Sequence, residues 1–174
     1  MKVPLDNNTA FFVGGADGDQ GDRTSYCETY FLDLTTRAWT PGPNMIHCRF
    51  YHTCNMITNA TSGHREIVVV GGFDQQREDH CKYIQEVEIF NLDTLQWRNG
   101  EGDTVWKRYF WNTLFLDNDM DITFDISATD FPRPIARHAS LYFEDSFLIM
   151  GGDSCTGCSA CSCTQCVPRD IIYQ

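Results

Sequence analysis

The chain has 174 residues, of which 42% are hydrophobic, 13% aromatic and 21% charged, and this composition excludes an intrinsically disordered protein. Its 24 acidic residues outnumber its 13 lysines and arginines, and the resulting net charge of −11 argues against nucleic-acid binding. No apolar stretch reaches the roughly 18 residues that a membrane-spanning helix needs, so we expect no membrane span. The length predicts one folded domain with a substantial core.

Short segments rich in β-branched and aromatic residues follow one another along most of the chain and predict strands. The first group is expected near residues 2–5, 10–13, 28–34 and 37–40. A second group is expected near residues 50–57, 66–70, 85–92 and 95–98. The third group is shorter and is expected near residues 136–143, 146–150 and 170–173.

Three apolar runs end in a pair of glycines, which is the first sign of an internal repeat. The pairs are Gly14–Gly15, Gly71–Gly72 and Gly151–Gly152. A glycine pair at the end of a strand lets the backbone adopt positive φ and leaves room where a Cβ would clash. We therefore interpret the three pairs as the ends of three equivalent buried strands.

A second repeated piece follows the first two glycine pairs. Residues 31–39 align without a gap on residues 89–97, and each segment ends in a tryptophan, Trp39 or Trp97. The polar residues before each tryptophan are typical of a tight turn between two strands. We expect the two indoles to be buried at equivalent places between neighbouring units, with a structural rather than a binding role.

A third element, Arg49-x-x-His52 or Arg137-His138, precedes the second and third glycine pairs. Together the ordered elements resemble the kelch-repeat β-propeller family, whose repeat has a period of about 50 residues. The resemblance implies an all-β fold, a kelch-type β-propeller fragment of four-stranded antiparallel blades. It also implies packing and hydrogen-bonding roles for His52 and His138.

By this resemblance the chain divides into two whole blades and an incomplete one. Blade 1 is expected at residues 1–40, blade 2 at 49–99 and incomplete blade 3 at 136–174, with a cysteine-rich loop at 153–169. The wider spacing before the third glycine pair indicates an aromatic and acidic insertion at 100–134. Because two and a half blades cannot close a ring, we expect a fragment of a longer protein, with assembly of several copies as the alternative.

The nine cysteines raise the question of a metal site. Five of them cluster in the cysteine-rich loop, namely Cys155, Cys158, Cys161, Cys163 and Cys166. Closely spaced thiolates hold zinc or iron–sulfur clusters, but this spacing matches neither zinc half-sites nor ferredoxin motifs. Local disulfides or free thiols are the favoured interpretation, so these five residues are weak metal candidates and no cofactor is expected.

Two classes of function are compatible with the resemblance, because propellers serve both as binding modules and as enzymes. The favoured function is a protein-interaction module, a propeller segment that presents loops to a protein partner. The alternative is part of a kelch-propeller enzyme, of the galactose-oxidase-like copper oxidase or isomerase kind. That oxidase needs two tyrosines and two histidines around the propeller axis, a set that cannot be assigned here, so no catalytic residue is predicted.

Five segments are expected on one side of the blades, where loops and blade connections emerge. They span residues 16–27, 40–48, 73–84, 100–134 and 153–169. The candidate binding residues all lie in the insertion and are Asp117, Asp119, Asp121 and Trp111. Because these segments carry a net negative charge, we expect a protein partner that is neutral or basic.

Observations on the compartment point in opposite directions. Nine cysteines and the glycosylation sequons that begin at Asn7 and Asn59 favour an extracellular protein. The first residues, 1–6, lack the apolar segment of a secretory signal, which favours the cytoplasm. An extracellular location is slightly favoured, and the compartment stays open.

Overall fold

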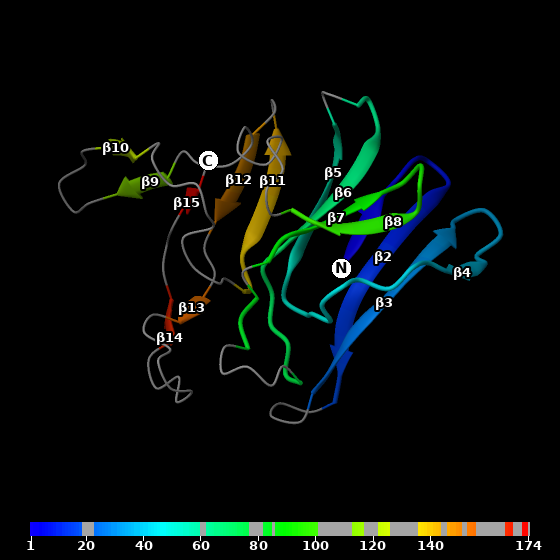
Figure 1. Cartoon of the computed structure of the whole chain (residues 1–174), viewed down its shortest axis with the longest axis horizontal. Helices are drawn as coiled ribbons and strands as arrows, with labels where there is room; N and C mark the ends of the chain where they lie inside the picture. Colours follow the sequence, from blue (N-terminus) through cyan, green and yellow to red (C-terminus); the bar gives the residue numbers. More distant parts are fainter. Residues whose placement is uncertain are drawn as a thin grey trace.

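The computed structural model describes residues 1–18, 23–59, 62–76, 82–84, 86–100 and 136–143, together with the backbone of six further strands. In this part of the chain the fold is all-β without a helix, and its sheets stand beside one another (Figure 1). The predicted fold class is therefore confirmed. None of the described segments forms a helix that could cross a membrane.

The first two sheets each contain four strands in up-and-down order. The first sheet contains β1 (Lys2–Pro4), β2 (Thr9–Asp17), β3 (Thr24–Asp33) and β4 (Trp39–Pro41). The second sheet contains β5 (Thr53–Thr58), β6 (Arg65–Val70), β7 (Glu88–Asn91) and β8 (Gln96–Asn99). All neighbouring strands pair antiparallel. The boundaries drawn for the blades themselves stay a prediction.

The third sheet contains five strands in the order β10–β9–β15–β12–β11. They are β9 (Thr113–Leu116), β10 (Ile122–Asp125), β11 (Ala139–Phe143), β12 (Ser146–Met150) and β15 (Ile172–Tyr173). β9 and β10 belong to segment 100–134, expected as an insertion between blades, and they extend the third sheet beside β15. A separate pair, β13 (Asp153–Cys155) and β14 (Cys166–Pro168), lies in the cysteine-rich loop.

The main core lies between the first two sheets. Seven buried side chains form it: Val3, Phe11, Val13, Met45, Ile67, Val69 and Phe90. The rings of Phe11 and Phe90 stack across the interface, with centroids 5.0 Å apart and planes 1° apart. Truncating a buried aromatic side chain costs about 3–5 kcal/mol, so this stack is a main source of the stability of the sheet pair.

The opposite face of the second sheet packs against the third sheet. Thr53 Oγ1 and His138 Nε2 lie 2.7 Å apart, and Asn55 Nδ2 donates to Ser140 Oγ at 2.5 Å. β5 and β11 thus lie side by side, as Figure 1 shows. The second sheet is covered on both faces, whereas the described residues cover only one face of the first sheet.

Trp97 and Trp39 occupy equivalent places in the two sheets. Trp97 pairs with Phe90 across β7 and β8, and Trp39 pairs with Leu32, which aligns with Phe90 in the repeat. Trp97 packs against the main core and donates from Nε1 to the Pro43 carbonyl oxygen at 2.9 Å. This tryptophan has the packing role that the repeat indicated.

The expected burial of Trp39 is wrong for this chain. Its side chain is 54% exposed and contacts Phe12 and Tyr30 on its own sheet, with ring centroids 4.7 and 6.3 Å away. The physical reason is the position of the tryptophan in the repeat. Trp97 lies on the face of the second sheet that packs against the first, and Trp39 lies on the equivalent face of the first sheet. No described residue supplies a sheet before β1, so this face of the first sheet stays uncovered.

The second glycine pair directly follows β6, as expected, whereas the first lies inside β2, which continues through a bulge to Asp17. Both pairs allow close contact with the chain that leads into β5. Gly14 has a φ of 50°, and a Cβ on it would lie 2.6 Å from the Arg49 carbonyl oxygen. Gly72 has a φ of 108°, and a Cβ there would lie 2.9 Å from the Phe50 carbonyl oxygen. Both positions require glycine for conformation and for space. Gly151 and Gly152 lie outside the described residues.

Candidate functional site

The two ends of the sheets are built differently. The turn end consists of the tight connections at residues 5–8, 34–38 and 92–95. The loop end consists of Arg23 with residues 42–52, 71–76, 82–84 and 136–138, which enter or leave strands at the opposite edge. Binding residues in proteins often lie on loops that a rigid scaffold positions, so the loop end is where a site is expected.

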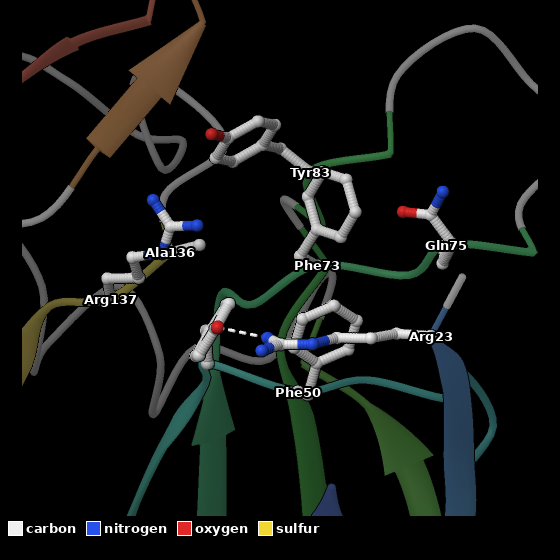
Figure 2. Close-up of a pocket in the computed structure, with 8 residues that line it drawn as sticks. Arg23, Phe50, Phe73, Gln75, Tyr83, Ala136 and Arg137 are labelled. Atoms are coloured by element: carbon white, nitrogen blue, oxygen red, sulfur yellow. Dashed lines mark hydrogen bonds between the residues drawn. The ribbon is translucent and has the colours of Figure 1, made fainter. Parts of the chain in front are cut away.

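A pocket of about 160 Å³ opens at the loop end (Figure 2). Segments associated with all three large sheets contribute its lining residues: Arg23, Phe50, Tyr51, Phe73, Gln75, Tyr83, Ala136 and Arg137. This lining contains two arginines and no carboxylate, although the chain as a whole has a net charge of −11. The described lining therefore brings two cationic side chains together on an acidic protein.

The floor of the pocket is aromatic and continues the second sheet beyond its glycine pair. Phe50 and Phe73 exchange two backbone hydrogen bonds of 3.0 and 2.8 Å, and Phe73 bridges on to Tyr83. The ring of Phe73 meets those of Phe50 and Tyr83 edge-on, with centroids 5.5 and 5.1 Å away. Edge-to-face packing is a favoured aromatic geometry, and here it fixes three apolar rings at the base of the site.

Arg23 enters the pocket from the first sheet and is held by the loop after β6. Gln76 accepts from the Ser25 amide at 2.7 Å and donates from Nε2 to the Arg23 carbonyl oxygen at 2.8 Å. The Arg23 guanidinium lies over the ring of Phe50, 5.6 Å from its centroid, and donates a hydrogen bond to the Tyr51 hydroxyl (Figure 2). The backbone and the head group of Arg23 are thus both positioned.

Tyr51 and Arg137 occupy equivalent places in the repeat, since each directly precedes the histidine of its arginine–histidine element. Both have a φ of 58°, which is uncommon for a residue other than glycine. The Arg137 amide donates to the Tyr51 carbonyl oxygen at 2.9 Å. Its guanidinium lies 4.7 Å from the centroid of the Tyr51 ring, a cation–π contact. The repeat therefore brings Tyr51 and Arg137 together on one rim.

A buried ion pair supports the chain that leads into the pocket. The side chains of Arg49 and Glu88 are both fully buried, and Arg49 Nη2 donates to Glu88 Oε1 at 2.5 Å. Glu88 also accepts from the amides of Ile46 and His47 at 2.7 and 2.9 Å. Arg49 donates from Nη1 to the Gly71 carbonyl oxygen at 2.9 Å. These bonds join β7, the end of β6 and the segment just before Phe50.

A disulfide between Cys27 and Cys48 adds a covalent link at the same place, joining β3 to the segment that precedes Arg49. Sequence analysis gave neither cysteine a role. Cys54, by contrast, is a free thiol that packs against the main core. Burial raises the pKa of Cys54 to about 12, so this thiol is unreactive at neutral pH.

The positive charge of the pocket comes from its arginines. The hydrogen bond from Arg23 lowers the pKa of the Tyr51 hydroxyl, and the charges of Arg23 and Arg137 act in the same direction. Burial lowers the pKa of His52 well below its ordinary value and that of His138 to about 4, so both imidazoles are neutral at pH 7. Both histidines are buried, as the resemblance implied, and His138 contacts Thr53 through Nε2. The implied hydrogen-bonding role is not seen for His52, since neither of its ring nitrogens has a hydrogen-bond partner among the described residues.

Most of the candidate site residues from the sequence fall outside the described part. Trp111, Asp117, Asp119 and Asp121 lie there, as do Cys158, Cys161 and Cys163. Cys155 and Cys166 are register partners in the β13–β14 pair. The described residues contain no group of three or more His, Cys, Asp and Glu side chains that could hold a metal ion. The acidic binding residues and the weak metal candidates therefore stay predictions.

The structure instead assembles a site that sequence reasoning did not name. The expected binding side includes segments 16–27 and 73–84, which supply Arg23, Phe73, Gln75 and Tyr83, but no single residue of the pocket was identified. The sequence did contain one indication of the site, because Tyr51 and Arg137 both directly precede a repeat histidine. Nothing in the sequence indicated the contact between Arg23 and Tyr51, since it forms only when two sheets pack together.

Comparison with known proteins supports the fold. Residues 58–102 match the family model of the kelch motif, while no curated protein matches the chain. Among 88 matching chains of solved structures is the structure of YjhT, at 18% identity and a TM-score of 0.52. The alignment covers 86% of this chain and 33% of that one, so the chain spans about a third of the matched structure. The resemblance to kelch-repeat propellers is confirmed, as a likeness of fold.

Proposed function

We propose that this kelch-type propeller segment is a protein-interaction module whose contact surface is the loop end. The observation that carries the proposal is the pocket, where two arginines and Tyr51 surround an aromatic floor that includes Tyr83. Tyrosine and arginine are enriched among the residues that dominate the energy of protein–protein binding. Tyr51 is 37% exposed and thus reachable from solvent.

The loop end is also rigid enough to bind without a large ordering cost. The Cys27–Cys48 disulfide and the Arg49–Glu88 pair fix the segment that carries Tyr51. Preorganisation raises affinity because less conformational entropy is lost on binding. The turn end, in contrast, consists of short turns that are held by local hydrogen bonds.

We propose a protein as the partner and a binding role without catalysis. The net charge of −11 disfavours nucleic acid. The expectation of a neutral or basic partner rests only on the acidic segment that contains Asp117, Asp119 and Asp121. The described lining of the pocket holds two arginines and would contact a different part of a partner. The Cys27–Cys48 disulfide supports an oxidising, extracellular setting for this interaction.

A matched pair of substitutions tests the proposal. Tyr51 at the loop end and Leu95 at the turn end are both exposed and have φ values of 58° and 56°. Asparagine tolerates this conformation, so Tyr51→Asn and Leu95→Asn remove a side chain with little change in the backbone. Immobilised chain, wild type and each variant, is used to capture proteins from the source extract, which are quantified by mass spectrometry.

The expected result is a protein that wild type and Leu95→Asn capture equally and Tyr51→Asn loses. The same set of captured proteins for all three chains would contradict the proposal. Circular dichroism and thermal melting of each variant serve as the control for folding.

A further inference from the structure

We infer that Asn7 is a site of N-linked glycosylation and that Asn59 is not, an inference that shares with the proposed function only its extracellular setting. The chain contains two sequons, at residues 7–9 and 59–61, and each ends in a threonine. An oligosaccharide on asparagine is bulky and hydrophilic, so its acceptor must lie at the surface of the folded protein. The two asparagines lie in opposite environments.

Asn7 is exposed in the turn that joins β1 to β2 at the turn end. Its neighbours hold this turn: Asp6 Oδ1 accepts from the Asn8 amide at 2.7 Å, and the Asn8 carbonyl oxygen accepts from the Leu34 amide at 2.7 Å. Within the described part of the chain no hydrogen bond involves the Asn7 side chain. The amide nitrogen of Asn7 can therefore carry a covalent group while the turn keeps its shape.

Asn59 follows β5 directly and is only 6% exposed. Its Nδ2 donates to Glu66 Oε2 at 3.2 Å, and its Oδ1 accepts from the Ser62 amide at 3.2 Å. Glu66 is itself buried and pairs with Arg98. A sugar on Nδ2 would need the space that the Glu66 carboxylate occupies and would expose or unpair buried polar groups. A glycan at Asn59 is therefore incompatible with this fold.

The disulfide between Cys27 and Cys48 is independent support for the setting that glycosylation requires. Disulfides form and persist in oxidising environments, which include the lumen of the endoplasmic reticulum and the cell exterior. Asparagine sequons are used as acceptors in proteins that pass through the same route. A chain that acquires this disulfide thus also meets the glycosylating enzyme.

The modification is a group transfer to the side-chain nitrogen of Asn7. Nδ2 attacks the anomeric carbon of an oligosaccharide that is linked to a lipid pyrophosphate. The bond between that carbon and the pyrophosphate oxygen breaks as the carbon–nitrogen bond forms. The lipid pyrophosphate leaves and Nδ2 loses one proton, so the step needs no oxidant or reductant.

The position of Asn7 also fits the division of the molecule into two ends. A glycan there would lie beside Leu34, which is 49% exposed and whose amide binds the same turn. It would shield this apolar side chain from other proteins. The loop end, which carries Tyr51 at the opposite edge of the sheets, would stay open for a partner.

Site occupancy, measured by mass spectrometry, tests the inference. The protein is purified from its source, and the full chain is secreted in parallel from a eukaryotic host. A glycosidase that converts each glycosylated asparagine to aspartate marks the occupied sites. Thr9→Ala and Thr61→Ala are the matched variants, because each removes a sequon hydroxyl and keeps the asparagine. Thr9→Ser keeps the sequon and controls for a change at the start of β2.

We expect both wild-type preparations to be occupied at Asn7 and unmodified at Asn59. Thr9→Ala should lose the glycan, whereas Thr61→Ala and Thr9→Ser should keep it. A source protein without a glycan at Asn7 would overturn the inference. Occupancy of Asn59 in the folded protein, with folding checked by circular dichroism, would overturn it too.

These outcomes are separable from the test of the proposed function. A partner that is captured through Tyr51 by a chain unmodified at Asn7 would leave the interaction module standing and remove the glycan. Conversely, a glycan at Asn7 with no protein captured through Tyr51 would support the modification and contradict the interaction module.

Discussion

The turn end and the loop end of the same sheets differ in how their backbone is held. At the turn end, local side chains suffice: Asp33 accepts from the amides of Thr35 and Thr36 at 2.8 and 2.9 Å. Asn91 accepts from the amides at 93 and 94, both at 2.9 Å. At the loop end the corresponding bonds are long-range, such as those from residues 46 and 47 to Glu88.

This difference indicates that the two ends of the repeat have different roles. A turn that satisfies its own backbone needs nothing from other sheets and presents little beyond polar side chains. A loop held by distant partners brings together residues from three sheets, and a pocket results. Changes at the loop end should therefore affect binding as well as stability, while changes at the turn end should affect stability alone.

The largest expected effect follows from breaking the buried ion pair. Glu88→Gln removes the carboxylate that pairs with the fully buried Arg49 guanidinium and should lower the free energy of unfolding by about 3–5 kcal/mol. Urea unfolding measures this change. Glu66→Gln is the control, because Glu66 is also buried but pairs with the more exposed Arg98 nearer the turn end. Its cost should be about 1–2 kcal/mol, and a larger cost for Glu66→Gln than for Glu88→Gln would refute the comparison.

Removal of the disulfide should rank second. Cys27 and Cys48 are 21 residues apart, and closing a loop of that length stabilises by about 3 kcal/mol. The double variant Cys27→Ser, Cys48→Ser should lower the free energy of unfolding by that amount and weaken capture of the protein partner through the loop end. Calorimetry and the capture experiment measure the two effects. Unchanged capture by the folded variant would show that the disulfide does not position the site.

Acid should destabilise the contact between the second and third sheets. The folded-state pKa of His138 is about 4, below the ordinary value of 6.5, so the unfolded chain binds the proton more readily. The stabilisation is complete above pH 6.5 and is lost as the pH falls toward 4, by up to about 3 kcal/mol.

In His138→Gln, the free energy of unfolding should fall less between pH 6.5 and 4 than it does in wild type. Chemical denaturation at a series of pH values measures this difference. Identical profiles for the two chains between pH 6.5 and 4 would show that His138 does not control it.

The smallest effect is expected at the turn end. Asn91→Ala removes the acceptor of two backbone amides and should cost about 0.5–1 kcal/mol, whereas Asn91→Asp keeps an acceptor and should cost less. Thermal melting distinguishes the two variants. Both should capture the protein partner as wild type does, and any loss of capture by a folded Asn91 variant would count against the separation of the two ends.

Sequence alone predicted what is local and repeated. Short runs of β-branched and aromatic residues and turn chemistry identified the strands of the first two sheets, and the second glycine pair marked where β6 ends. The first pair did not mark the end of its strand, because β2 continues through a bulge at Gly14 and Gly15 to Asp17. It could not predict the exposure of Trp39, because each repeat tryptophan is covered by a different sheet. It could not pair Cys27 with Cys48 or Arg23 with Tyr51, because both pairs form only once the strands are assembled.

The candidate site was predicted as a side of the molecule and not as a set of residues. Segments 16–27 and 73–84 were expected on the binding side, and they carry Arg23 and Phe73 of the pocket. Net charge summed over whole loops indicated a neutral or basic partner. The described lining of the pocket instead holds two arginines: Arg23 lies in one of those loops and Arg137 lies outside them.

A crosslinking scan tests the central claim, that the loop end is the contact surface, most directly. The photoreactive residue p-benzoylphenylalanine is placed at Gln75 and Lys82 of the loop end and at Leu34 and Leu95 of the turn end, one position in each chain. We predict that Gln75 and Lys82 crosslink to the same protein partner and that Leu34 and Leu95 do not. Crosslinks from the turn end with none from the loop end would contradict the account.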